Sequence, residues 1–332
     1  MNAIKALLAL SFFVFGVAGC GEKDPDPSSQ IEKITLAVTP WPASAPLYVA
    51  HEKGYFQDEG LDTTIRSYIS GHLGLGAVIS GEVDFATVGE TPIAQAAVDG
   101  KQIAVVATIS RIERAILVIA RKDRGISKPE DLKGKRIGVV AGTTADFFLY
   151  LYLATSHIDP KEARIVNLPT EEIVGALIKG EVDAVSTWAP HTTILRDKLG
   201  GNATILHDPS IYTMTWNIVA RPDTLKSRPE RVQKLLRAVV RANTFITEHT
   251  AEAHAISARS LGTNTSLYER EWNDYAFEAS LDQSLILNLE DQARWLIKRE
   301  GDNERRTPNF TNFIHVDGLK AVQPEAVRMV GK

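Results

Sequence analysis

Residues 79–92 read ISGEVDFATVGETP, residues 178–190 read IKGEVDAVSTWAP, and both contain the tetrapeptide Gly-Glu-Val-Asp. Each copy follows a segment with helical spacing of apolar residues and precedes a short apolar run typical of a buried strand. The glycines, Gly81 and Gly180, stand where the end of a helix favours a left-handed residue. We therefore predict equivalent helix-to-strand turns in two similar halves, and we expect the Glu and Asp not to touch a ligand.

The sequence around both copies alternates between strand and helix patterns. Examples are the strand-like run 33–40, the helical run 45–54 and the alternating run 61–69, and a second such series spans about 136–188. From Pro229 onward the pattern is mainly helical. Alternation of this kind predicts an α/β fold with mostly parallel sheets flanked by helices. A duplication without functional meaning would produce the same pattern.

Composition narrows the function classes. The chain has 332 residues, 44% of them hydrophobic, and a formal net charge of -4, which fits about two globular domains. The negative charge and the lack of a basic run argue against nucleic-acid binding. The eight histidines are scattered without metal-ligand spacing, so we expect no metal site and no cofactor.

The N-terminus predicts export. Lys5 precedes an apolar stretch that ends in small residues and is too short to cross a bilayer, so residues 1–19 are interpreted as a signal peptide. Val17-Ala18-Gly19-Cys20 resembles a bacterial lipobox, which predicts a lipid on Cys20; an ordinary signal peptide is the alternative. Residues 20–31 are interpreted as a flexible tether. Cys20 is the only cysteine, so no disulfide and no cysteine nucleophile is expected in the fold.

Five blocks carry a more specific resemblance. They are PWPASAPLYVAHEKGYFQDEGLD (40–62), GISKPEDLKGKRIGVVAGTTADF (125–147), ALIKGEVDAVSTWAP (176–190), ARPDTLKSRPERVQKLLRAVVRA (220–242) and FIHVDGLKAVQPEAV (313–327). In this order they resemble the periplasmic substrate-binding proteins that serve ABC importers of nitrate, taurine and alkanesulfonates, the NMT1/THI5-like family. The resemblance covers about residues 33–327.

The resemblance implies a type II periplasmic-binding-protein fold. Lobe one would comprise residues 32–110 and 217–332, and lobe two residues 111–216, with hinges near 108–114 and 212–217. Such proteins close around a ligand by hinge motion. The expected partners are a small-molecule ligand, an ABC permease with its ATPase, and the membrane through the lipid anchor. We expect a monomer that is not an enzyme, anchored in the bacterial cell envelope and facing the periplasm or cell exterior.

Ligand-binding residues are predicted where strands end and helices begin, because helix N-termini favour anions and α/β ligands bind at the carboxyl ends of strands. Tryptophans at strand ends are interpreted as cavity walls, with core packing as the alternative. Arg111 follows a strand and is either an anion partner or a surface charge. Asp146 either caps its own helix or faces the cleft. The predicted set is Trp41, Ser44, Ser70, Gly71, His72, Glu90, Thr91, Ser110, Arg111, Thr143, Thr144, Asp146, Trp188 and Trp216.

The predicted ligand is a small organic anion resembling an organosulfonate or taurine. Helix starts and hydroxyl groups suit a sulfonate, and tryptophan walls would also suit an aromatic compound. Nitrate, an aromatic carboxylate and a pyrimidine or thiamine precursor remain alternatives. Two further functions stay open: an enzyme like the related pyrimidine synthase, which uses a cysteine-rich segment that this chain lacks, and a lipoprotein that senses a ligand without transport.

Overall fold

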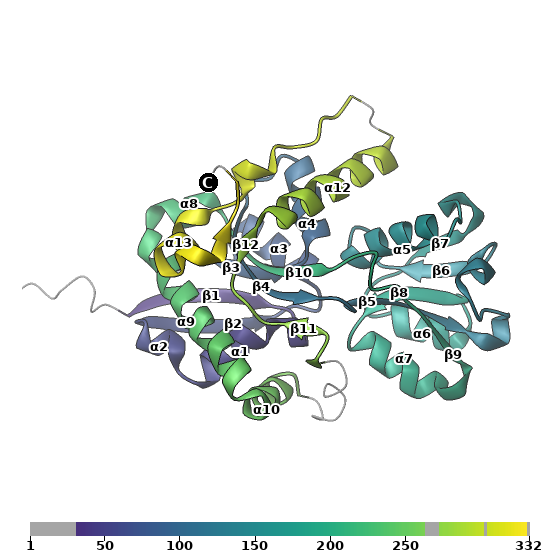
Figure 1. Cartoon of the computed structure of the whole chain (residues 1–332), viewed down its shortest axis with the longest axis horizontal. Coiled ribbons are helices and arrows are strands. Elements are labelled where there is room, and N and C mark those ends of the chain that lie inside the picture. Colours follow the sequence, from purple (N-terminus) through teal and green to yellow (C-terminus); the bar gives the residue numbers. More distant parts are fainter. Residues whose placement is uncertain (1–30, 263–271, 302–303, 331–332) are drawn as a thin grey trace, which may run out of the picture. The chain divides into compact units, whose positions relative to one another are not determined.

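The structure is a computed structural model that describes residues 31–262, 272–301 and 304–330. The predicted signal peptide, Cys20 and all of the predicted tether except Ile31 lie outside the described residues. The described strands form two main sheets, and helices pack against both (Figure 1). This confirms the predicted two-lobe α/β architecture; the six-stranded sheet belongs to the first lobe and the five-stranded sheet to the second.

The six-stranded sheet has the order β11-β4-β10-β3-β1-β2. β1 is parallel to β2 and β3, whereas β10 is antiparallel to β3 and β4, and β11 is antiparallel to β4. Its strands are β1 (Glu32–Val38), β2 (Leu61–Ser67), β3 (Phe85–Val88), β4 (Ala104–Ile112), β10 (Met214–Ala220) and β11 (Tyr275–Ala276).

The five-stranded sheet has the order β7-β6-β8-β5-β9. β6 is parallel to β7 and β8, whereas β5 is antiparallel to β8 and β9. Its strands are β5 (Ile116–Arg121), β6 (Arg136–Val139), β7 (Arg164–Asn167), β8 (Ala184–Trp188) and β9 (Ala203–Leu206). A short parallel pair joins β12 (Leu281–Asp282) to β13 (Val327–Arg328).

Both sheets are mixed, which corrects the prediction that they are mostly parallel. β4 carries the chain out of the first lobe and β10 brings it back, so the two strands run in opposite directions as neighbours in one sheet. The chain passes between the sheets at residues 113–115 and 207–213. The predicted hinges, 108–114 and 212–217, overlap these connections and the adjoining ends of β4 and β10, and the lobe boundaries stay a prediction.

Helices cover the sheets and position the loops. In the first lobe α3 packs on β1 and β3, α4 packs on α12, and α9 contacts α1 and α13; in the second, α5 and α7 pack on β5 and β8. No described helix is both long enough and apolar enough to cross a membrane. The helices are α1 (Ala45–Glu52), α2 (Tyr55–Asp58), α3 (Gly71–Ser80), α4 (Glu90–Val98), α5 (Thr144–Thr155), α6 (Ile173–Lys179), α7 (His191–Leu199), α8 (Pro222–Ser227), α9 (Pro229–Glu248), α10 (Thr250–Ser260), α12 (Gln283–Glu300) and α13 (Val316–Val322).

The repeated tetrapeptide forms the same turn twice. Gly81 ends α3 at φ 81° and Gly180 ends α6 at φ 75°, the left-handed conformation that glycine adopts without a steric penalty. The Asp84 carboxylate accepts the backbone N–H of Thr35 on β1 at 2.7 Å. Asp183 likewise accepts the backbone N–H of Arg136 on β6 at 2.9 Å. Each aspartate therefore fastens its turn to the neighbouring strand.

An arginine completes each turn. Arg221, just after β10, donates to the carbonyl of Val78 in α3 at 2.9 Å, and Arg121, at the end of β5, donates to the carbonyl of Ile178 in α6 at 2.7 Å. These carbonyls lie in the last turn of a helix, where the usual donor four residues further on is missing; that of Val78 also accepts the N–H of Gly81 at 3.0 Å. The repeated tetrapeptide is thus part of one structural unit, which consists of a helix end, an aspartate and an arginine and occurs once in each lobe.

Candidate ligand-binding site

A mainly apolar cavity lies where the strands of both lobes end. Its volume is about 40 Å³, room for a few water molecules and less than the roughly 300–1,000 Å³ of sites for drug-sized ligands. Both lobes contribute to its wall. The lobe of the six-stranded sheet, to which β10 belongs, supplies Thr39, Trp41, Ser70, Gly71, His72, Gly89, Pro92, Met214 and Trp216, and the lobe of the five-stranded sheet supplies Ile116, Thr143, Thr144, Ala145 and Trp188.

Three helices begin at this wall. Gly71 and His72 open α3, Gly89 directly precedes α4, and Thr144 opens α5. Ser70 caps α3, since its hydroxyl accepts the N–H of Leu73 at 3.4 Å. The first backbone N–H groups of a helix have no intrahelical acceptor and carry the positive end of its dipole. The cavity therefore favours a negatively charged or hydrogen-bond-accepting group.

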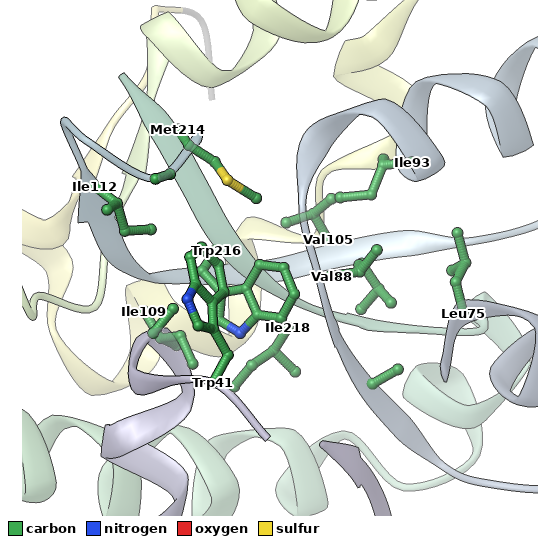
Figure 2. Packing of buried hydrophobic residues seen from close by; sticks show 14 of the residues in the cluster. Trp41, Leu75, Val88, Ile93, Val105, Ile109, Ile112, Met214, Trp216 and Ile218 are labelled. Carbon is green, nitrogen blue, oxygen red and sulfur yellow. The ribbon is translucent and has the colours of Figure 1, made fainter. Parts of the chain in front are cut away.

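Two indoles form the floor of the cavity. The rings of Trp41 and Trp216 meet edge to face, with centroids 4.9 Å apart and planes at 86°, and Met214 lies beside them (Figure 2). The Trp216 indole N–H donates to the Ser44 hydroxyl at 2.9 Å, which fixes that ring. The Trp41 indole N–H has no acceptor among the described residues, although Trp41 is only 2% exposed.

The hydroxyl of Thr39 is a second unpaired polar group in this wall. Thr39 follows β1, is 4% exposed, and its Oγ1 has no partner among the described residues. A buried polar group without a partner costs about 1–3 kcal/mol. Both groups can donate a proton, so a bound molecule with acceptor oxygens would remove this cost. Among the described residues, no Asp, Glu, Lys or Arg lines the cavity, and His72 is the only titratable side chain in its wall.

The structure brings eight of the predicted residues into one wall: Trp41, Ser70, Gly71, His72, Thr143, Thr144, Trp188 and Trp216. The predicted set of binding residues omitted the remaining wall residues, Thr39, Gly89, Pro92, Ile116, Ala145 and Met214. Thr39 and Gly89 directly follow strands and Pro92 lies in the first turn of α4, so the rule that selected their neighbours also covers them. Ile116 and Met214 lie beside the interlobe connections and carry no pattern that separates them from core residues.

Ser44 and Ser110 lie behind the wall and support it. Ser44 is fully buried; its hydroxyl donates to the carbonyl of Thr39 at 3.0 Å and accepts from Trp216. Ser110 donates to the carbonyl of Ala43 at 3.0 Å. Both hydroxyls are therefore used in holding the backbone and the indole that face the cavity.

Glu90 and Thr91 begin α4 but point into the protein. Glu90 is fully buried, and its Oε1 accepts the backbone N–H of Thr215 on β10 at 2.7 Å. Burial raises the pKa of Glu90 to about 7. The hydroxyl of Thr91 contacts the side-chain oxygen of Gln292 on α12. These residues join α4 to β10 and α12 instead of lining the cavity.

The two predicted charged residues, Arg111 and Asp146, are occupied by partners. Arg111 donates to Ser280 at 2.9 Å and forms ion pairs with Glu278, at 3.2 Å, and with Asp282. Asp146 accepts the N–H of Gly142 at 2.9 Å and pairs with Arg299. Arg111 therefore sits in a surface charge network, and Asp146 caps the start of α5.

A two-lobe α/β fold with a cavity between helix N-termini of both lobes defines the class of periplasmic binding proteins. The chain belongs to the NMT1/THI5 like family, whose model matches residues 41–253. This confirms the resemblance drawn from the five sequence blocks.

Named relatives agree with this class. The chain is 29% identical to the taurine-binding periplasmic protein of Escherichia coli over 220 residues, 64% of this chain and 67% of the relative. Among solved structures it resembles the alkanesulfonate-binding protein SsuA of Xanthomonas axonopodis bound to MOPS, with a TM-score of 0.73, 18% identity, and coverage of 86% of this chain and 99% of that one. The first is named for binding taurine and the second for binding alkanesulfonates.

Enzymes also occur among the relatives. The chain is 26% identical over 270 residues to the 4-amino-5-hydroxymethyl-2-methylpyrimidine phosphate synthase of Aspergillus parasiticus, 73% of this chain and 76% of the relative. Most of the other curated relatives are named binding proteins. Family membership thus shows descent shared with binding proteins and leaves the ligand to the chemistry of the cavity.

Proposed function

We propose that the protein is the substrate-binding component of an ABC import system and captures a small organosulfonate, such as taurine or an alkanesulfonate, between its lobes. The observation that supports it most is the pair of buried, unpartnered donors, the Thr39 hydroxyl and the Trp41 indole N–H, in a wall where three helices begin. A sulfonate offers three acceptor oxygens around one negative charge. The indoles would cover its apolar side.

The absence of a charged residue from the described wall bears on the choice of ligand. A carboxylate ligand is commonly held by a bidentate arginine, whereas backbone N–H groups and hydroxyls suffice for an anion at a helix N-terminus. Of the ligands considered, a sulfonate fits this donor set best. Nitrate has the same oxygens but no apolar part for the indoles to cover.

The assay is a thermal-shift screen of the mature protein with ethanesulfonate, taurine, nitrate, benzoate and a hydroxymethylpyrimidine, followed by calorimetry. A ligand present at about 100 times its dissociation constant should raise the free energy of unfolding by about 2.7 kcal/mol. Stabilisation by ethanesulfonate or taurine is the expected result. Stabilisation by the pyrimidine alone would reject the sulfonate proposal.

Binding without catalysis is part of the same proposal. The relative that is a pyrimidine synthase resembles this chain, but the only cysteine of this chain is Cys20, and no cysteine lines the cavity. Mass spectrometry of the ligand after prolonged incubation with the protein should show it unchanged. Conversion of the ligand would overturn the proposal, and an adjacent gene pair for a permease and an ATPase would favour transport over sensing.

We also propose that Cys20 carries the lipid anchor. The motif Val17-Ala18-Gly19-Cys20 and the single cysteine support this. Mass spectrometry of the mature protein should find diacylglycerol on Cys20, and Cys20→Ala should release the protein from the membrane fraction. An unmodified Cys20 in membrane-derived protein would leave an ordinary signal peptide as the better interpretation.

A further inference from the structure

Asp146, in the first turn of α5, lies next to residues that line the cavity and contacts two partners. Thr143, Thr144 and Ala145 line the cavity, and Asp146 is the next residue along the helix. Its side chain is 11% exposed and accepts the backbone N–H of Gly142 at 2.9 Å. Its second partner is the guanidinium of Arg299, with which it forms an ion pair.

Arg299 reaches Asp146 from the other lobe. It lies near the end of α12, which packs on α4, while α5 packs on β5 and β8 of the second lobe. The guanidinium also covers the ring of Trp295 at 4.4 Å, and that ring meets the edge of Phe147 on α5 with centroids 5.4 Å apart. The ion pair and the aromatic contact therefore form together, and both require α5 and α12 to be in contact.

The ion pair between Asp146 and Arg299 affects which ligand charge the cavity accepts. A carboxylate in the first turn of α5 opposes an anion at the same helix N-terminus, and this repulsion is strongest where water is excluded. Arg299 cancels that charge in the arrangement seen here. A separation of α5 from α12 would remove this counterion from Asp146.

From this arrangement we infer that Arg299 is a specificity-determining residue, a counterion that the first lobe supplies to Asp146 on closure so that the closed cavity accepts an anion. The inference rests on the proposed capture of an anionic sulfonate. It predicts that loss of Arg299 penalises anions more than zwitterions, because the unpaired Asp146 repels a sulfonate and attracts an ammonium group.

The test is a double-mutant cycle with Arg299→Gln, Asp146→Asn and the double variant, read by calorimetry with ethanesulfonate, taurine, nitrate and benzoate. Lys298→Gln is the matched control, because Lys298 is the exposed neighbour in the same helix and pairs with no acid among the described residues. Arg299→Gln should weaken ethanesulfonate binding by about tenfold and taurine binding by less than about threefold. The double variant should recover ethanesulfonate binding to within about threefold of the original protein.

The outcomes separate this inference from the proposed function. If ethanesulfonate binds normally but Arg299→Gln weakens it no more than Lys298→Gln does, or the double variant fails to recover, the inference is overturned and the function stands. If the original protein binds nitrate or benzoate instead and the cycle behaves as described with that anion, the sulfonate proposal falls and the inference stands. Binding of no anion would overturn both.

Discussion

The two copies of Gly-Glu-Val-Asp form the same turn, but the strands that follow them, β3 and β8, lead to different residues at their far ends. After β3 the chain passes through Gly89 and starts α4 with Glu90. In the second lobe β8 ends with Trp188 in the wall, and α7 starts with His191. Gly89 lets the lobes approach, and Trp188 fills space between them. The identical turns build the frame, and the unlike ends shape the cavity.

The helices that follow also begin with opposite titratable groups. Burial raises the pKa of Glu90 to about 7 and lowers the pKa of His191 to about 4. The His191 ring nitrogen Nδ1 lies 3.0 Å from the hydroxyl of Thr187, and its ring lies beside that of Trp188. Burial thus favours the neutral form of both groups, one in each lobe.

The largest expected effect is the pH dependence that Glu90 gives to the free energy of unfolding. The folded state binds the Glu90 proton more tightly than the unfolded chain does, so this group stabilises the fold below about pH 4.5 and its contribution is lost as the pH rises to about 7. A shift from 4.5 to about 7 corresponds to about 3 kcal/mol. In Glu90→Gln this fall should disappear, as measured by urea unfolding at a series of pH values.

His191 should act in the opposite direction. Its lowered pKa means that the unfolded chain binds the proton more tightly, so stability is full above about pH 6.5 and falls toward pH 4. His191→Gln should remove that loss and serves as the matched comparison for Glu90→Gln. If Glu90→Gln keeps the pH dependence of the original protein between pH 5 and 7, the buried acid is not the cause.

The second largest effect is expected when a β-carbon is added at Gly89. A β-carbon at this position would lie 2.7 Å from Thr144 Oγ1 of the other lobe and 2.5 Å from the Met214 methyl group. Gly89→Ala should therefore hinder closure and weaken ligand binding by about a hundredfold, about 2.7 kcal/mol. Small-angle scattering with and without ligand would show whether closure is lost.

Gly76→Ala is the control, because no heavy atom lies within 4 Å of a β-carbon at Gly76. Both glycines have backbone conformations that alanine can adopt, so the comparison isolates the crowding at Gly89 by Met214 and by Thr144. Unchanged affinity in Gly89→Ala would mean that the loop yields and that the close approach does not limit closure.

The sequence predicted the frame better than the site. The turn motif, the helix starts and the five family blocks depend on local chemistry, and Asp84, Asp183 and the cap at Ser70 behave as local rules require. The direction of β4 and β10 depends on how the chain passes between lobes, which no local pattern records. The partners of Arg111 and Asp146 lie 167 and 153 residues away in the sequence, so only the fold reveals that these charges are neutralised.

The third expected effect is smaller and concerns Asp84 and Asp183, which fasten the two repeated turns to their neighbouring strands. Asp183→Ala should lower the free energy of unfolding by about 2 kcal/mol and Asp84→Ala by about 1 kcal/mol, because each leaves a strand N–H without its partner and Asp183 is the less exposed. Ligand affinity should change less than about twofold, since neither residue lines the cavity. Denaturant unfolding measures the first quantity and calorimetry the second.

Glu82→Ala and Glu181→Ala are the matched controls for the frame. Glu82 pairs with Arg66 and accepts the Tyr68 hydroxyl at 2.9 Å, and Glu181 pairs with Lys179. All these contacts are exposed, so each loss should stay below about 1 kcal/mol. A loss of ligand affinity in an aspartate variant that keeps its stability would contradict the division between frame and site.

The smallest expected effect returns to the tryptophan that only the second copy contains. Trp188 is 9% exposed and lines the cavity, so Trp188→Phe removes indole surface that would cover the apolar part of a ligand while keeping an aromatic ring in place. Ligand binding should weaken by about fivefold, about 1 kcal/mol. Trp272→Phe is the control, since Trp272 is similarly buried but packs against Phe277 away from the cavity. Equal losses of affinity in both variants would mean that Trp188 acts through stability, and the second loop would then differ from the first in packing alone.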